Sequence, residues 1–174
     1  MSYILEKDIL PSNCIKQIKL LLTELDFILA REDTYQHMFF DPNYVFAGLS
    51  RVTSINDNLS NNNKLLYTRL NDFGFMITEL VCKKANINIK HIKRFMWNLY
   101  KKGEEGTKHT DEEDDSYYTI LYSLNTSDGY LEVGDKKIYD VENEAKIFKS
   151  NLLHRGVGPK NSNYRLNLNI VIQV

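Results

Sequence analysis

The segment HIKRFMWNLY, residues 91–100, is where the hydrophobic pattern of the chain changes to a period of two. In an extended strand its apolar side would carry Phe95, Trp97 and Leu99, and its other side would carry Arg94, Met96, Asn98 and Tyr100. Short segments of similar character follow at residues 116–124, 130–133, 136–141, 145–148 and 165–174. Turn residues at 127–129, 134–135 and 156–159 would separate them. The second half of the chain is therefore predicted to be a β-sandwich or β-barrel.

Upstream of this segment the sequence predicts two helices. Ser12 is a suitable N-cap for the first, whose apolar face would consist of Cys14, Ile18, Leu21, Leu22 and Leu25. The second follows from spacings of four and three between Leu66, Leu70, Phe73, Ile77 and Leu80. Helices followed by many short strands are typical of an α+β fold. We expect one domain over residues 1–174, with helical support in about residues 1–90 and a β core in about residues 91–174.

The stretch between the two helices is predicted to be a loop. Its last part, NDNLSNNN at residues 56–63, is too polar to pack and is expected to be mobile. A moving lid is a second expectation for residues 39–63, which include Phe39, Phe40, Tyr44 and Phe46. Aromatic residues of this kind more often belong to an ordinary core, so both interpretations stay open.

Composition and charge narrow the class of protein. The 174-residue chain has a formal net charge of −1, which gives no overall attraction to nucleic acid or to an anionic membrane. Cys14 and Cys82 are far apart in sequence and fit neither a disulfide framework nor a zinc knuckle. No apolar run approaches the ~18 residues of a membrane span, and the N-terminus lacks the pattern of a secretory signal. These features predict a reduced, cytoplasmic protein, and abundant Asn, Lys and Ile suggest a viral or bacterial origin.

The run HTDEEDD, residues 109–115, contains a candidate metal site. Because side chains two residues apart project to the same side of an extended segment, His109 and Asp111 can reach one ion. His154 lies 45 residues further on and would complete the two-histidine, one-carboxylate triad that binds Fe(II) with open positions. A bare His-x-Asp pair in an acidic run is, however, more often a solvated loop. The remaining acidic residues, 112–115, are either a charged rim beside the ion or such a loop.

The last predicted strand supplies a second signal. Its leucine and isoleucine face would pack on the core, so Arg165, Asn167 and Asn169 would point into the barrel. A buried guanidinium needs an anion, and a dicarboxylate bound through a bidentate fork would provide one. The alternative is that Arg165 pairs with one of the 23 acidic side chains of the chain.

Several segments together resemble the Fe(II)/2-oxoglutarate-dependent oxygenases, in particular those similar to prolyl-4-hydroxylase. The matching segments are NLYKKG (98–103) before HTD (109–111), ILYSLN (120–125) with DGYLEV (128–133), and KIFKSN (146–151) before HRGV (154–157). The resemblance covers about residues 94–174 and departs from the family pattern at Ser123 and Tyr130, where an aromatic residue and a second glycine are usual.

The resemblance implies a double-stranded β-helix, a jelly-roll or cupin-like barrel, with supporting helices on its N-terminal side. It implies Fe(II) bound by His109, Asp111 and His154, O2 and 2-oxoglutarate as cosubstrates, and ascorbate as a further candidate cofactor. The proposed 2-oxoglutarate-binding residues are Arg165, Tyr100, Asn98 and Asn167, and the candidate substrate-binding residues are Arg94, Met96, Thr119 and Asn169. No catalytic residue beyond the metal site is expected.

Three classes of function stay open at this point. The first is a hydroxylase of prolyl or other protein residues, with a protein or peptide partner and a monomeric or weakly dimeric state. The second is an AlkB-like nucleic-acid demethylase or a hydroxylase of small molecules or free amino acids. Val171 stands where AlkB-type enzymes have a second arginine, which disfavours nucleic acid as substrate. The third, a β-helix binding module without catalysis, is disfavoured by the complete triad and Arg165.

Overall fold

The computed structural model describes residues 3–24 and 61–174. Two helices and eight strands occur in these residues: β1 (Ile4–Glu6), α1 (Ser12–Glu24), α3 (Asn61–Ala85), β2 (His91–Lys101), β3 (Tyr117–Ser123), β4 (Ser127–Val133), β5 (Lys136–Asp140), β6 (Ala145–Lys149), β7 (His154–Val157) and β8 (Tyr164–Gln173). The predicted lid of residues 39–63 lies outside the described residues up to residue 60. Neither described helix is long and apolar enough to cross a membrane.

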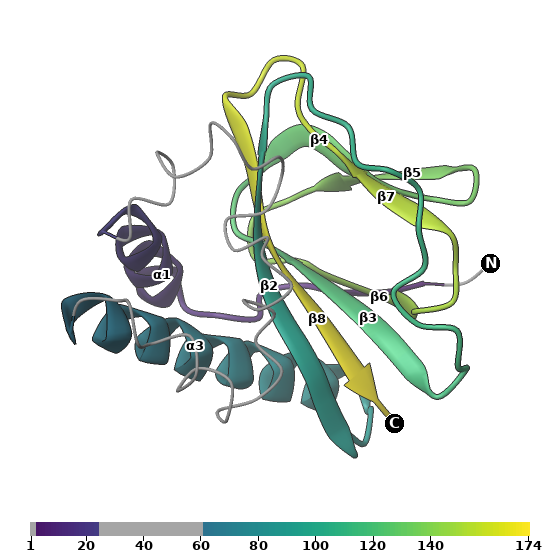
Figure 1. Ribbon diagram of the computed structural model, residues 1–174, viewed down its shortest axis with the longest axis horizontal. Coiled ribbons are helices and arrows are strands. Elements are labelled where there is room, and N and C mark those ends of the chain that lie inside the picture. Colours follow the sequence, from purple (N-terminus) through teal and green to yellow (C-terminus); the bar gives the residue numbers. More distant parts are fainter. Residues whose placement is uncertain (1–2, 25–60) are drawn as a thin grey trace.

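The strands form two antiparallel sheets. The larger sheet has the order β1-β6-β3-β8-β2, and the smaller has the order β5-β4-β7. Single bridges between Glu105 and Val157 and between His109 and His154 continue the smaller sheet beyond β7. Figure 1 shows the larger sheet between the smaller sheet on one side and α1 and α3 on the other. This arrangement is the double-stranded β-helix with supporting helices, so the predicted fold class is confirmed.

The outer face of the larger sheet packs against the helices through a single hydrophobic core. Phe95, Trp97 and Leu99 of β2 lie in this core, as predicted from their spacing. A T-shaped contact joins the rings of Phe75 and Phe95, with centroids 5.0 Å apart. The helices and β8 contribute most of the remaining buried side chains: Ile15, Ile18, Leu21, Leu22, Leu70, Ile77, Val81, Leu166, Leu168, Ile170 and Ile172. The opposite face of β2 and β8 therefore points between the two sheets.

The structure differs at four places from what the sequence predicted. Residues 61–63 begin helix α3 and are not part of a loop. Residues 127–129 belong to β4, and their turn-like composition coincides with an irregular register between Ser127 and Tyr130. Gly156 and Val157 belong to β7, which was not predicted as a strand, and β1 was also missed. Both missed strands have only three or four residues, too few for a clear alternating pattern.

Candidate metal centre and the adjoining ion network

His109, Asp111 and His154 come together at one end of the barrel, as predicted. One ligand atom from each lies within 4.8 Å of the other two. The Nε2 atom of His109 is 3.7 Å from Asp111 Oδ1, and the Nε2 atom of His154 is 3.4 Å from Asp111 Oδ2. The imidazole rings of the two histidines have centroids 4.5 Å apart. The group therefore has the ligand types and the compactness of a facial metal site.

The backbone explains why these three residues meet. His109 and His154 face each other across an antiparallel bridge and exchange two backbone hydrogen bonds of 2.9 Å. The amide of Asp111 donates a third backbone hydrogen bond, also 2.9 Å, to the carbonyl oxygen of Ser150. The segment that carries His109 and Asp111 is thus extended, and both side chains can project to the same side.

A backbone carbonyl group close in sequence orients the ring of each histidine. The Nδ1 atom of His109 lies 2.9 Å from the carbonyl oxygen of Thr107, and that of His154 lies 2.8 Å from the carbonyl oxygen of Leu152. A carbonyl oxygen only accepts, so each Nδ1 carries a hydrogen and each Nε2 is left with a lone pair in the neutral ring. Nε2 of His154 is buried and has no hydrogen-bond partner within residues 3–24 and 61–174. This orientation is the usual one for metal-bound histidines.

The carboxylate of Asp111 is held on both sides. Thr119 donates its hydroxyl hydrogen to Oδ2 at 2.6 Å, and the guanidinium of Arg94 contacts Oδ1. Burial alone would raise the pKa of Asp111, but interactions with His109, His154 and Arg94 hold it well below its usual value. The carboxylate in turn raises the pKa of His109. The site therefore favours a cation between its three ligand atoms, whether a proton or a metal ion.

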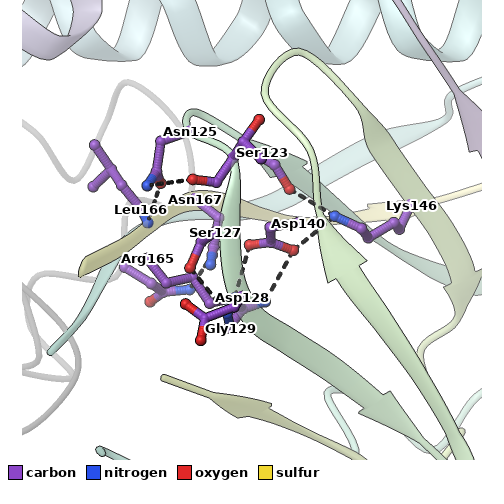
Figure 2. Close-up of polar contacts among 12 residues, drawn as sticks. Ser123, Asn125, Ser127, Asp128, Gly129, Asp140, Lys146, Arg165, Leu166 and Asn167 are labelled. Atoms are coloured by element: carbon purple, nitrogen blue, oxygen red, sulfur yellow. Dashed lines mark hydrogen bonds and ion pairs between the residues drawn. The ribbon is translucent and has the colours of Figure 1, made fainter. Parts of the chain in front are cut away.

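Arg165 points into the barrel, and its side chain is fully buried. Asp140, at the end of β5, accepts a hydrogen bond of 2.7 Å from Arg165 Nε and another of 2.7 Å from Lys146 Nζ. Lys146 also donates to Ser123 Oγ at 2.7 Å (Figure 2). Thus Arg165 pairs with an acidic residue of the chain, one of the two alternatives that the sequence left open. Its Nη1 atom nevertheless has no hydrogen-bond partner in the part of the chain that the structure describes.

Tyr100 and Gly156 connect this ion network to the metal centre. The guanidinium of Arg165 lies over the Tyr100 ring, 4.8 Å from its centroid. A Cβ atom on Gly156 would lie 2.2 Å from the Tyr100 hydroxyl and 2.8 Å from Arg165 Nη1, so only glycine fits there. Residues 154 and 156 face the same side of β7, with their Cα atoms about 6.8 Å apart along the strand. One strand thus borders both the metal centre and the free edge of the guanidinium.

The other residues that were predicted to bind cosubstrate or substrate differ in their burial and in their hydrogen bonds. Asn98 donates to Asn167 Oδ1 at 3.1 Å across the β2–β8 pair, and both side chains are buried. Asn169 is buried with its Oδ1 unpaired among the described residues, and Met96 is half-buried on the same face of the larger sheet. Thr119, predicted as a substrate contact, donates its hydroxyl hydrogen to the carboxylate of Asp111. Sequence reasoning assigned no role to Asp140, Lys146 or Ser150, although the last two lie in the segment KIFKSN that carries part of the resemblance.

Three of the four acidic residues that follow Asp111 have partners in their own surroundings. Glu112 forms an ion pair of 2.5 Å with Lys93, and Asp115 accepts a hydrogen bond of 2.6 Å from Asn151. Asp114 accepts a hydrogen bond of 2.7 Å from the Ser116 amide. Of the two interpretations of residues 112–115, these contacts favour a loop over a charged rim beside the ion.

Comparison with known proteins confirms the fold. No family model and no curated protein sequence matches the chain. Among solved structures, AviO1 from Streptomyces viridochromogenes Tue57 superposes with a TM-score of 0.65 at 13% identity, covering 99% of this chain and 89% of its own. A Trichoplax adhaerens prolyl hydroxylase, solved with a peptide fragment of the hypoxia inducible factor oxygen degradation domain, has a TM-score of 0.59 at 15% identity, with coverages of 98% and 83%.

A third solved structure is similar to the same extent. The non-heme α-ketoglutarate-dependent epimerase SnoN from nogalamycin biosynthesis has a TM-score of 0.58 at 13% identity, with coverages of 98% and 77%. Identities this low establish the shared fold but not a shared activity. The resemblance to prolyl-4-hydroxylase-like oxygenases, noted from the sequence, is therefore confirmed at the level of the fold. The chain has the double-stranded β-helix on which those oxygenases are built.

Proposed function

We propose that the protein is an Fe(II)- and 2-oxoglutarate-dependent dioxygenase that hydroxylates a C–H bond. The observation that carries this proposal is the cluster of three ligand atoms at His109, Asp111 and His154, with both histidine Nδ1 atoms bound to backbone carbonyls. Three protein ligands on one side of an ion leave room for a bidentate cosubstrate and for O2. Zinc would also accept these ligands, but the open face beside a buried arginine favours a redox metal with an anionic cosubstrate.

The cosubstrate would lie between the metal centre and Arg165. Its distal carboxylate would meet Nη1 of Arg165, which has no partner within residues 3–24 and 61–174, beside the hydroxyl of Tyr100. Burial raises the pKa of Tyr100, so the phenol remains a neutral hydrogen-bond donor. Asn98 and Asn167 would line the same face and hold each other in place. These assignments follow the predicted roles of the four residues.

Bound iron and 2-oxoglutarate would supply oxidation of a C–H bond by O2, with release of succinate and CO2. The protein's part is to fix the ligand geometry, to exclude water and to aim one substrate bond at the metal. The buried side chains of His154 and Asp111 form the interior wall of the centre, whereas the His109 side chain is 49% exposed. Substrate would therefore enter on the His109 side, next to Arg94.

For the substrate we propose a residue of a protein or peptide, with proline first. The support is the prolyl-hydroxylase-like β segments and a structural neighbour that was solved with a peptide. A small molecule is the second candidate, because SnoN is equally similar in fold and acts in nogalamycin biosynthesis. Arg94, Met96, Thr119 and Asn169 remain candidates for substrate contact. A nucleic-acid substrate is disfavoured by Val171 and by the acidic loop.

A succinate-release assay with Fe(II) and 2-oxoglutarate across peptide, free amino acid and nucleotide panels tests this function. A prolyl or other protein hydroxylase should form succinate with a peptide and add 16 mass units to it, a gain of one oxygen atom. His154→Ala should lose this turnover, whereas His91→Ala, at an exposed position at the start of β2, should keep it. Absence of succinate from the wild-type protein with every panel, together with absence of Fe(II) binding, would leave a non-catalytic binding module.

A further inference from the structure

Three ionisable side chains form a closed group inside the barrel. Asp140 lies between Lys146 and Arg165, and the side chains of all three are completely buried. The group contains two cations and one anion, so it has a net charge of +1. An unbalanced charge on buried side chains is costly unless a further partner arrives. The structure identifies where that partner would bind, because Arg165 Nη1 is buried and unpaired within the described residues.

Lys146 and Arg165 compete for one oxygen of the Asp140 carboxylate. Asp140 Oδ1 accepts its hydrogen bond of 2.7 Å from Lys146, whereas the distance from the same oxygen to Arg165 Nη2 is 3.5 Å. The guanidinium is therefore held firmly only through Nε, at 2.7 Å from Oδ2. Without Lys146, Asp140 Oδ1 could close on Arg165 Nη2, so that the carboxylate would bind the Nε and Nη2 edge of the guanidinium tightly and balance its charge.

Ser123 makes this arrangement possible. It stands where the resembling family usually has an aromatic residue, and its small hydroxyl accepts a hydrogen bond from Lys146 Nζ at 2.7 Å. The residue is fully buried, so a larger side chain would compete with Lys146 for this space. The small residue at position 123 and the buried Lys146 therefore depend on each other.

We propose that Lys146 is a positioning residue that engages Asp140 and thereby keeps a positive charge on Arg165 available for the distal carboxylate of a dianionic 2-oxo acid. This proposal rests on the function proposed above and adds a determinant of cosubstrate selectivity on strand β6. Lys146 acts through Asp140 and does not itself contact the cosubstrate. Selectivity for a diacid over a monoacid therefore depends on the charge of the whole group, not on Arg165 alone.

Two variants test this charge balance. Lys146→Met removes one cation and brings the group to zero, whereas the double variant Lys146→Met/Asp140→Asn restores +1 with side chains of similar size. The probes are 2-oxoglutarate and 2-oxopentanoate, which has the same chain length without the distal carboxylate. Their binding to the Fe(II)-loaded protein would be measured under anaerobic conditions by calorimetry, with thermal unfolding as the check on folding.

Lys146→Met should weaken binding of 2-oxoglutarate by about tenfold or more and leave 2-oxopentanoate within about twofold of wild type. The double variant should recover most of the affinity for 2-oxoglutarate. Unchanged 2-oxoglutarate binding by Lys146→Met, or equal losses for both acids, would overturn the proposal. If Lys146→Met does not fold, the double variant decides: wild-type preference for the diacid supports the proposal, and loss of that preference overturns it.

The same measurements separate this proposal from the proposed function. A wild-type protein that binds neither acid, or binds both equally, contradicts the assignment of 2-oxoglutarate itself and removes the basis of the inference. A wild-type protein that prefers 2-oxoglutarate while Lys146→Met behaves identically keeps the function and rejects the role of Lys146.

Discussion

The metal centre and the ion network differ in their ratio of hydrogen-bond donors to acceptors. At His109, Asp111 and His154 acceptors are in excess, because two Nε2 lone pairs and a carboxylate converge. At Asp140, Lys146 and Arg165 donors are in excess, because two cations surround one carboxylate and one guanidinium nitrogen has no partner among the residues that the structure describes. The first region therefore suits a cation and the second suits an anion. A ligand with a metal-chelating end and a carboxylate end would satisfy both.

The largest expected effect concerns the region with excess acceptors. Asp111→Ala removes the only charged ligand of the triad, so we expect Fe(II) binding to fall below detection in an anaerobic titration. Asp115→Ala is the matched control, because it belongs to the same acidic run but bonds to Asn151. Circular dichroism would confirm that both variants are folded. Equal Fe(II) affinity of the two variants would show that the carboxylate of Asp111 is not a ligand.

The next effect concerns stability in the region with excess donors. Asp140→Asn leaves two buried cations without an anion, which should lower the free energy of unfolding by about 3–5 kcal/mol. Arg165→Met leaves Asp140 and Lys146 as a balanced pair, joined at 2.7 Å, and should cost less. Urea unfolding of both variants measures the difference. A larger loss for Arg165→Met than for Asp140→Asn would mean that packing of the arginine, not charge balance, dominates this region.

The two regions also differ in how far the sequence reveals them. His109 and Asp111 are one residue apart, so their common side on an extended segment follows from local geometry alone. The alternation in β8 likewise placed Arg165 inside the barrel, and the period-two pattern of β2 predicted which face meets the helices. Local patterns of this kind are independent of the rest of the fold.

Asp140 and Lys146 could not be predicted in the same way. Asp140 ends a strand just before a turn, where an exposed aspartate is common, and Lys146 lies in a short strand where a lysine usually faces solvent. The contacts of Asp140 with Lys146 and Arg165 depend on how β5, β6 and β8 are placed in two different sheets. Strand β7 was missed because Gly156 and the glycine-proline pair after it have the composition of a turn, although Gly156 is there to make room for Tyr100 and Arg165.

The smallest expected effect returns to the metal centre and asks what holds its carboxylate. Thr119→Val removes the 2.6 Å hydrogen bond to Asp111 Oδ2 at nearly constant volume, and loss of such a supporting bond should weaken Fe(II) binding by about 10–100-fold. Thr78→Val is the control, because Thr78 is equally buried but donates at 2.7 Å to a carbonyl oxygen within α3.

The loss for Thr119→Val should stay below that for Asp111→Ala because two other contacts of the aspartate survive. The guanidinium of Arg94 still meets Oδ1, and the Asp111 amide still donates to the Ser150 carbonyl oxygen at 2.9 Å. If Thr119→Val binds Fe(II) as tightly as Thr78→Val, the backbone and Arg94 alone orient the carboxylate. The hydroxyl of Thr119 would then serve its 2.9 Å contact with Ser150 and the packing of β3 against β6, and the metal centre would owe its geometry to the strands.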